Sequence, residues 1–243
     1  MRVLLAEDLI LLAYCNETGA PQQSTDESFD YRLVGALLVE LVTLHRVELT
    51  AENSVDGAGK KIKKGRVVVR GLGSAGHPEL DEALAKIAEK PRKPQELPGL
   101  LSRGLRQRLL TGLAERGILR EEKSKVLRLF PITRWPAEDS AHENALIERL
   151  KAVLLDGAEP DMRERSIIGL AKGWWLIRNL VPKDRRKAAE ARAEEIRESE
   201  WAGEAVEKAI SAAEAVMIAV LMPTIMVSVV SSSSYSSYSG AGC

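Results

Sequence analysis

The sequence predicts a mainly α-helical protein with a few short strands. Apolar residues recur at helical spacing in the first third of the chain, as Leu33, Leu37, Leu41 and Leu44 show. From Ser140 onward the pattern is that of consecutive helices. The short strand candidates do not alternate regularly with helices, so a parallel sheet built from βαβ units is not expected.

The N-terminal part is expected to hold two helices and two short strands. Residues 4–14 predict a short helix followed by a strand, and residues 31–49 predict a core helix that runs into a strand at Arg46–Leu49. Residues 50–65 form a loop or hairpin that leads into a second strand, Arg66–Arg70, which is rich in valine.

The middle of the chain predicts two further helices. Pro78 opens the first, which extends to residue 90 and has acidic residues in its first turn. Residues 91–98 are proline-rich and serve as a linker. Residues 100–117 predict the second helix, which ends at a glycine. Its buried stripe consists of Leu101, Leu105, Leu109 and Leu113.

The remainder begins with a β-hairpin, because residues 118–136 alternate in polarity around a turn at 121–125. Helices are then expected over residues 141–157, 162–181 and 183–221. The serine-rich end of the chain predicts disorder.

Total charge limits the class of partner. The 243 residues include 35 Lys and Arg and 35 Asp and Glu, for a formal net charge of +0. A dedicated nucleic-acid-binding protein usually has a basic excess, so any basic site here must be local. Cys15 and Cys243 are too few for a disulfide framework or a tetrahedral thiolate site. A reducing, cytoplasmic setting is therefore expected.

Neither end of the chain has the pattern of a membrane segment. Glu7 and Asp8 interrupt the apolar start, which argues against a signal peptide. The apolar stretch Ala215–Val230 is sixteen residues long and contains Pro223. A transmembrane helix needs roughly 20 residues, so we do not expect a span.

Catalytic motifs are weak. Gly71–Gly76 is a literal G-x-G-x-x-G, but the following helix starts at Pro78, after the last glycine, so we interpret the motif as a connection. The three histidines, His45, His77 and His142, have no metal-ligand spacing. We therefore expect no enzyme activity, no metal and no cofactor.

Two basic features remain. The first is a cluster of six basic residues within eleven positions, which is either a solvated loop or a segment attracted to an anionic surface: Lys60, Lys61, Lys63, Lys64, Arg66 and Arg70. The second is a pair of arginines on the helix predicted over residues 100–117. Arg103 and Arg106 are three residues apart on the predicted helix, so both guanidinium groups are expected on one face, a geometry suited to a phosphate. A helix followed by a hairpin is also typical of a winged-helix DNA-binding domain, a less favoured alternative.

Five segments occur in the order and spacing of the Golgi phosphoprotein 3 family, which the chain resembles from about Leu4 to Leu221. They are "EDLILLAY", "LVGALLVELVTLHRVEL", "PELDEAL", "LRQRLLTGLAERGIL" and "LLDGAEPDMRERSIIGLAK". The abundance of Ala, Arg, Glu and Leu in these segments resembles the bacterial, actinobacterial branch of the family. The resemblance implies one domain over residues 1–222, a central helical bundle surrounded by amphipathic helices with a protruding β-hairpin, and a tail over 223–243.

The resemblance also implies a non-enzymatic peripheral membrane protein. Eukaryotic members bind phosphatidylinositol 4-phosphate on the cytosolic face of the Golgi and gather the cytosolic tails of glycosyltransferases. For this chain it implies an anionic phospholipid membrane as partner, with cytosolic tails of membrane proteins as further partners and no nucleic acid. A structural adaptor that recruits proteins without a working lipid site is the alternative.

Carried over to this sequence, the lipid pocket of the family matches in part. Two pocket arginines fall on Arg103 and Arg106. A third aligns with Val34, with Arg32 nearby as a substitute. The pocket tryptophan is missing, and Phe29 and Tyr31 are the aromatics in that region. These differences leave lipid selectivity open.

The membrane-touching hairpin of the family maps onto residues 125–136. The resemblance implies that Phe130, Ile132 and Trp135 insert into the membrane interface, where tryptophan is favoured. The same hairpin mediates self-association in some members, so a homo-oligomer is the competing expectation for these apolar residues.

Overall fold

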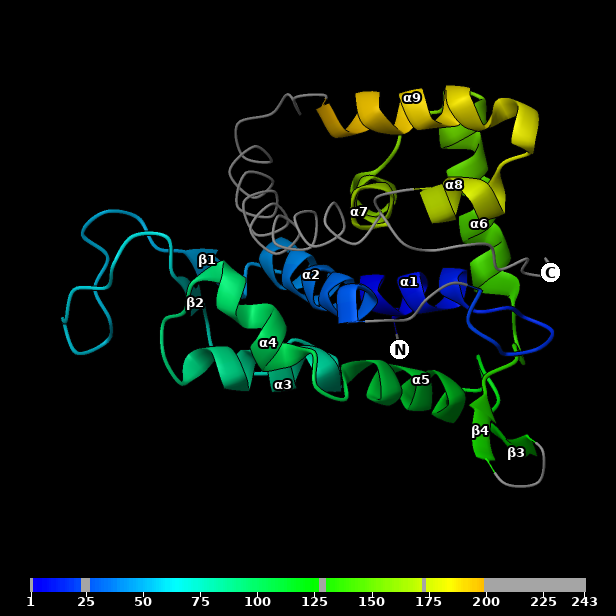
Figure 1. Ribbon diagram of the computed structural model, residues 1–243. Helices are drawn as coiled ribbons and strands as arrows, with labels where there is room; N and C mark the ends of the chain where they lie inside the picture. The colour runs from blue at the N-terminus through cyan, green and yellow to red at the C-terminus, as the bar shows by residue number, and fades with distance from the viewer. Residues whose placement is uncertain (1, 23–26, 127–129, 172–173, 199–243) are drawn as a thin grey trace, which may run out of the picture. The chain divides into compact units, whose positions relative to one another are not determined.

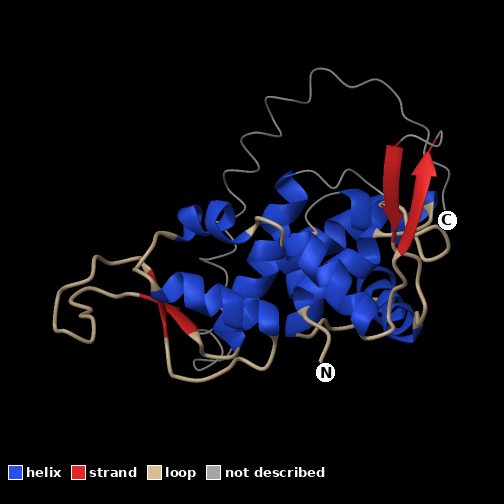
Figure 2. Cartoon of the chain, turned by 90° about the horizontal axis from the view of Figure 1, so that it is seen from below, coloured by secondary structure: helices blue, strands red, loops and turns tan. Residues whose placement is uncertain are grey.

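The computed structural model describes residues 2–22, 27–126, 130–171 and 174–198 of the chain. The described residues are mainly helical, with two small antiparallel two-stranded sheets, which confirms the predicted fold class (Figures 1 and 2). They separate into two compact units. The first unit contains residues 2–22 and those from Arg106 onward, and the second contains Glu27–Leu105. The expected extent of a single domain, 1–222, stays a prediction.

The first unit is built around its N-terminal helix, α1 (Leu5–Ala13), in which every residue is buried. Helices α6 and α7 pack against α1, and α9 covers α6, α7 and α8 (Figure 1). The other elements of this unit are α5 (Leu105–Glu115, in this unit from its second residue), β3 (Glu122–Val126), β4 (Phe130–Arg134), α6 (Ala141–Leu155), α7 (Met162–Leu170), α8 (Trp174–Leu180), the 3-10 helix η2 (Lys183–Arg185) and α9 (Arg186–Glu198).

Local signals explain where α7 begins. The Asp161 carboxylate accepts a hydrogen bond from the Glu164 backbone N–H at 2.8 Å, and the Glu164 carboxylate accepts one from the Asp161 N–H at 2.8 Å. This capping box satisfies two backbone donors that the helix itself leaves unpaired. The helix expected over residues 162–181 is two helices, α7 and α8, with residues 172–173 outside the described part of the chain.

The second unit is built on the apolar helix α2 (Glu27–Thr43). Leu33, Leu37 and Leu41 are at most 1% exposed, so these three members of the predicted stripe are confirmed, whereas Leu44 lies just after α2 and is half-buried. Helix α2 packs against α3, α4 and β1. The chain leaves α2 through His45, which has a φ of 54°, the left-handed conformation of a helix C-terminal cap. The other elements are β1 (Val47–Leu49), β2 (Val67–Val69), α3 (Pro78–Ala88), the 3-10 helix η1 (Pro94–Glu96) and α4 (Leu97–Leu101).

The two predicted strands of this unit are confirmed. β1 and β2 pair in antiparallel register, with Val47 opposite Val69 and Leu49 opposite Val67. A long loop, residues 50–66, joins them and extends away from the strands (Figure 1). The predicted start of α3 at Pro78 is also confirmed, with His77 as its N-cap, because the His77 imidazole Nδ1 accepts a hydrogen bond from the Glu79 N–H at 3.3 Å.

Two boundaries differ from the prediction. The hairpin exists, but residues 121–125 lie almost wholly within strand β3, and Val126 pairs with Phe130, with residues 127–129 outside the described part of the chain. Polar alternation continues through a solvated strand, so it could not locate the turn. At the N-terminus the strand expected after α1 is reduced to a single bridge between Tyr14 and Pro21. The predicted tail, 223–243, lies outside the described residues.

Candidate functional site

The helix predicted over residues 100–117 is two helices. α4 ends at Leu101, the chain turns through Ser102 to Gly104, and α5 begins at Leu105. Gly104 has a φ of 70°, a conformation that breaks an α-helix and that glycine adopts without strain. The expectation that Arg103 and Arg106 share one helical face is therefore wrong, since only Arg106 lies in α5.

The arginines differ in exposure as well as in element. Arg103 is exposed in the turn, whereas Arg106, the second residue of α5, is half-buried. The predicted apolar stripe is confirmed, because Leu105 and Leu113 are fully buried and Leu109 is 1% exposed. Both arginines therefore lie at the start of α5, beside residues that anchor it.

The start of α5 favours an anion. Its first turn contains no acidic residue, unlike that of α3, which contains Glu79 and Asp81. The N-terminal end of a helix carries partial positive charge and unpaired backbone N–H groups, which suit a phosphate. Arg103 precedes this end in the chain, and Arg106 is the second residue of α5.

The remaining residues expected in the pocket lie on α2. Arg32 and Tyr31 are half-buried, and Phe29 is 2% exposed. Val34 is fully buried, so the position that the resemblance assigns to a third arginine is part of the apolar core. Phe29 is likewise packed in the core rather than displayed to a ligand.

The three apolar residues expected to insert into a membrane differ in how far the structure exposes or describes them. Ile132 is half-buried on β4, opposite Ser124 of β3. The Phe130 side chain lies outside the described part of the structure. Trp135, just beyond β4, is only 4% exposed, which corrects the expectation that it inserts into a membrane. The backbone explains this, because the Trp135 N–H donates to the Gly19 carbonyl at 3.0 Å and holds the residue against the loop after α1.

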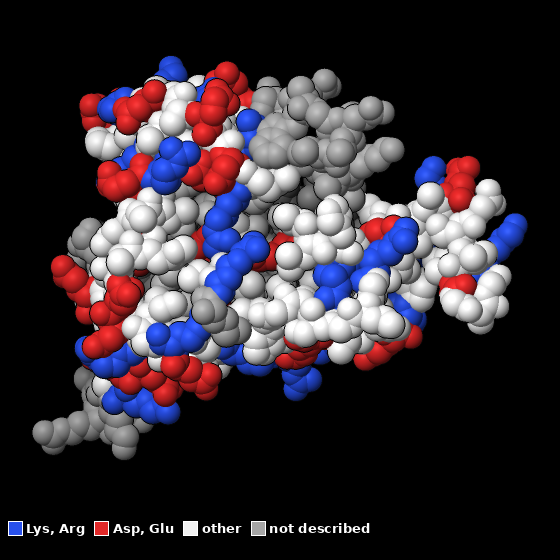
Figure 3. Space-filling view, turned by 180° about the vertical axis from the view of Figure 1, so that it is seen from behind, with Lys and Arg blue, Asp and Glu red and all other residues white. Residues whose placement is uncertain are grey.

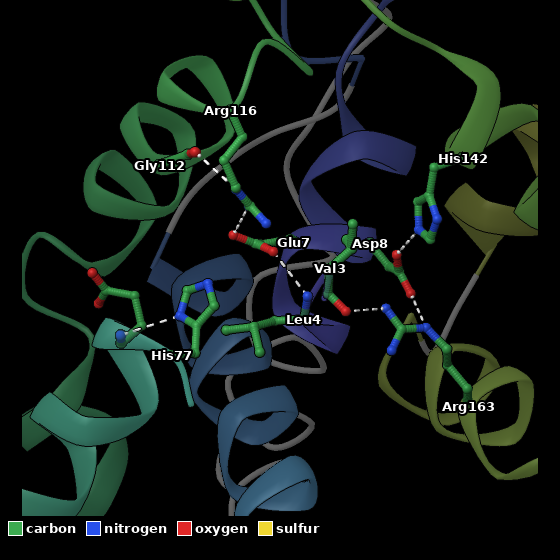
Figure 4. Close-up of polar contacts among 10 residues, drawn as sticks. Val3, Leu4, Glu7, Asp8, His77, Gly112, Arg116, His142 and Arg163 are labelled. Carbon is green, nitrogen blue, oxygen red and sulfur yellow. Dashed lines mark hydrogen bonds and ion pairs between the residues drawn. The ribbon is translucent and has the colours of Figure 1, made fainter. Parts of the chain in front are cut away.

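A buried charged cluster in the first unit was not predicted. Glu7 and Asp8 in α1 have fully buried side chains. The Glu7 carboxylate accepts from the Leu4 N–H at 2.8 Å and forms an ion pair with Arg116, which follows α5 (Figure 4). Two adjacent acidic residues in an apolar stretch are the sequence signal, since buried carboxylates require partners.

Asp8 holds three helices together. Its Oδ1 lies 2.8 Å from His142 Nε2 on α6, and its Oδ2 accepts from Arg163 Nε on α7 at 2.6 Å (Figure 4). Arg163 also donates to the Val3 carbonyl at 2.8 Å. The Asp8 carboxylate raises the pKa of His142, against the smaller opposing effect of burial.

Glu143, next to His142, is a different kind of buried acid. Its side chain is enclosed, and burial raises its pKa from 4.5 to about 7, although a hydrogen bond from Asn16 favours the charged form. One carboxyl oxygen, Oε2, makes no hydrogen bond. Across the described ranges, no group of three or more His, Cys, Asp or Glu side chains is placed to hold a metal ion.

The glycine motif is a loop closed by its own neighbours. The Asp81 carboxylate accepts from the Ser74 hydroxyl at 2.6 Å and from the Ala75 N–H at 2.5 Å. Arg46 donates to the Gly73 carbonyl at 2.5 Å. These contacts hold residues 71–76 as a loop that leads into α3, in agreement with our interpretation of the motif as a connection.

No helix within the described ranges is long and apolar enough to cross a bilayer. A comparison with protein-family models matches residues 5–213 to the Golgi phosphoprotein 3 (GPP34) model. This match extends over most of the 243 residues and includes both units of the described structure. The chain is therefore a member of the Golgi phosphoprotein 3 (GPP34) family.

Proposed function

We propose that this chain is a cytoplasmic, non-enzymatic peripheral membrane protein that binds an anionic phospholipid head group. Phosphatidylinositol 4-phosphate is the expected lipid. Membership of the GPP34 family is consistent with a lipid-binding module of this kind. The observation that carries the proposal is that the first turn of α5 contains Arg106 and no acidic residue, with Arg103 two residues before the helix.

Chemistry favours a phosphate over a carboxylate at this position. An arginine offers paired N–H donors that match two oxygens of one phosphate, and a phosphomonoester has enough oxygens for two such groups. The backbone N–H groups of a helix start add donors that do not depend on side chains. Arg32 on α2 is the proposed third cation, in place of the arginine that Val34 replaces.

The hairpin supplies the proposed apolar contact. Phe130 and Ile132, two residues of β4, are the proposed apolar contacts. Trp135 is left out because it is buried. Self-association through the same hairpin and recruitment of cytosolic tails remain proposals for this family member.

Vesicle co-sedimentation tests the head-group site. Wild-type protein should bind phosphatidylcholine vesicles that contain phosphatidylinositol 4-phosphate more tightly than vesicles that contain phosphatidylinositol. We expect Arg103→Ala/Arg106→Ala to weaken this preference by at least about ten-fold, because a hydrogen bond to a charged group contributes roughly 1.5–3 kcal/mol. Lys183→Ala/Lys187→Ala removes the same charge from exposed positions and should leave the preference unchanged.

The burial of Val34 favours a second candidate, the adaptor without a working lipid site. A phosphate pocket with an apolar core residue in place of one arginine has fewer donors for a defined inositol phosphate. Equal binding of wild-type protein to all of these vesicles, or an unchanged preference in the double arginine variant, would favour the adaptor and contradict the lipid site.

A further inference from the structure

The loop between β1 and β2 carries a basic surface that the proposed function does not use. Residues 50–66, called here the lysine loop, contain five basic residues and two acidic ones. The lysines of the loop are all exposed: Lys60, Lys61, Lys63 and Lys64. The loop extends away from the two strands (Figure 1). Sequence alone left open whether this segment is merely solvated.

The base of the lysine loop is held by Thr50, which is 4% exposed. Its hydroxyl donates to the Lys63 carbonyl at 2.7 Å and accepts from the Arg66 N–H at 2.9 Å. Its backbone N–H donates to the Arg66 carbonyl at 2.8 Å. The two halves of the loop are thereby kept side by side, so the lysines are presented on an ordered support.

The tip is held by Asp56. One carboxylate oxygen accepts from the N–H groups of Ala58 and Lys60 at 2.9 and 2.8 Å. The Ile62 N–H donates to the Ser54 carbonyl at 2.8 Å. Because these bonds order the loop before any partner arrives, binding through it loses little conformational entropy.

The positive charge of the loop is incompletely neutralised. Lys64 pairs with Glu52 at 3.2 Å, and Arg66 pairs with Glu96 at 3.5 Å. The ammonium groups of Lys60, Lys61 and Lys63 form no ion pair with any residue that the structure describes. Three like charges within four residues repel one another, and an anionic surface relieves that repulsion.

An exposed apolar side chain accompanies these charges. Val55 is 55% exposed and forms a β-bridge with Lys61, so the two side chains lie on the same face of the loop. A membrane interface suits this pair, because an apolar side chain enters the acyl boundary while a lysine keeps its ammonium group among the head groups.

We propose that the lysine loop contacts the surface of an anionic phospholipid bilayer through Lys60, Lys61 and Lys63, with Val55 at the interface. This contact needs negative lipid but no particular head group, so it is separate from the phosphate site at α5. Nucleic acid fits less well, because residues 50–66 contain no aromatic side chain for base stacking.

The test uses full-length protein and phosphatidylcholine vesicles that contain phosphatidylglycerol and no phosphoinositide. Each lysine near an anionic leaflet strengthens binding by about five-fold. Lys60→Gln/Lys61→Gln/Lys63→Gln is therefore expected to reduce binding by at least about 30-fold. Val55→Ser should give a smaller loss. Circular dichroism checks that each variant is folded.

The matched control, Lys90→Gln/Lys93→Gln/Lys187→Gln, removes three other exposed lysines and should bind as wild type does. The proposal is overturned if wild type ignores these vesicles, or if the loop variant binds normally. An equal loss in the control overturns it too. A DNA mobility shift that the loop variant abolishes would assign the loop to nucleic acid instead.

The phosphate site has a separate readout. Arg103→Ala/Arg106→Ala should lose the preference for phosphatidylinositol 4-phosphate over phosphatidylinositol, whereas the loop variant should keep that preference. Failure of the loop contact and failure of the phosphate site therefore produce different results.

Discussion

Glu143 illustrates what a single buried carboxyl contributes. Burial raises its pKa from 4.5 to about 7, so the folded protein holds a proton that the unfolded chain has released over this pH range. A group whose pKa is higher in the folded state than in the unfolded state stabilises the folded protein fully at pH values below its unfolded pKa. That stabilisation is lost as pH rises through the folded value.

We therefore predict that stability falls between about pH 4.5 and pH 7, and that Glu143→Gln reduces the fall. The loss assigned to this carboxyl is on the order of 3 kcal/mol. Urea unfolding of both proteins at pH 5, 6, 7 and 8 measures it. The pKa of His142 is also raised, so this residue too makes stability fall as pH rises, and its contribution remains in the Glu143→Gln variant. Parallel pH profiles for the two proteins would contradict the prediction.

At the scale of elements, Gly19 fixes how the loop after α1 meets the end of the hairpin. Its φ is +60°, and an added Cβ would come within 2.2 Å of the backbone nitrogens of Trp135 and Pro136. Neighbouring bonds join the same segments, since the Ala137 N–H donates to the Asn16 carbonyl at 2.8 Å. A side chain at position 19 must push these backbones apart.

Gly19→Ala is expected to destabilise the protein by about 3 kcal/mol, at the upper end of the usual range for point substitutions. Thermal or urea unfolding provides the measurement. Gly57→Ala is the control, because no atom lies within 4 Å of its added Cβ and its φ is outside the left-handed region. Equal stability of the Gly19 variant and wild type would show that this close approach is not required.

Elements also show why the sequence prediction was incomplete. The apolar stripe of α5 and the glycine that ends it follow from local spacing, and both are confirmed. The break at Gly104 is equally local, but leucines on both sides continue the helical period and conceal it. An isolated glycine inside a helical pattern is usually tolerated, so periodicity favoured one helix.

For the whole molecule, charge decides which partners are excluded. Basic and acidic side chains are interspersed over the face shown in Figure 3, in keeping with the formal net charge of +0. Non-specific binding to DNA depends on neutralising many phosphates at once, which needs a broad basic surface. A local cluster such as the lysine loop neutralises too few phosphates to act as such a broad basic surface.

We accordingly predict no mobility shift of duplex DNA with wild-type protein at about 0.15 M salt, where the Debye length is about 8 Å. Binding to phosphatidylglycerol vesicles should weaken as the salt concentration is raised above this value, because salt screens the exposed charges. A salt-sensitive DNA complex of micromolar affinity would revive the winged-helix alternative for α5 and the hairpin.

The sequence by itself determined the helical class, the buried stripes, the start of α3 and the family, because these depend on spacing and on residues close in the chain. Only the tertiary structure decided that Trp135 is buried and that Glu7 and Asp8 are neutralised. Glu7 meets Arg116 across 109 residues, and Asp8 meets His142 and Arg163 across 134 and 155. Partners so distant are chosen by how helices pack around a buried charge, which no local pattern encodes.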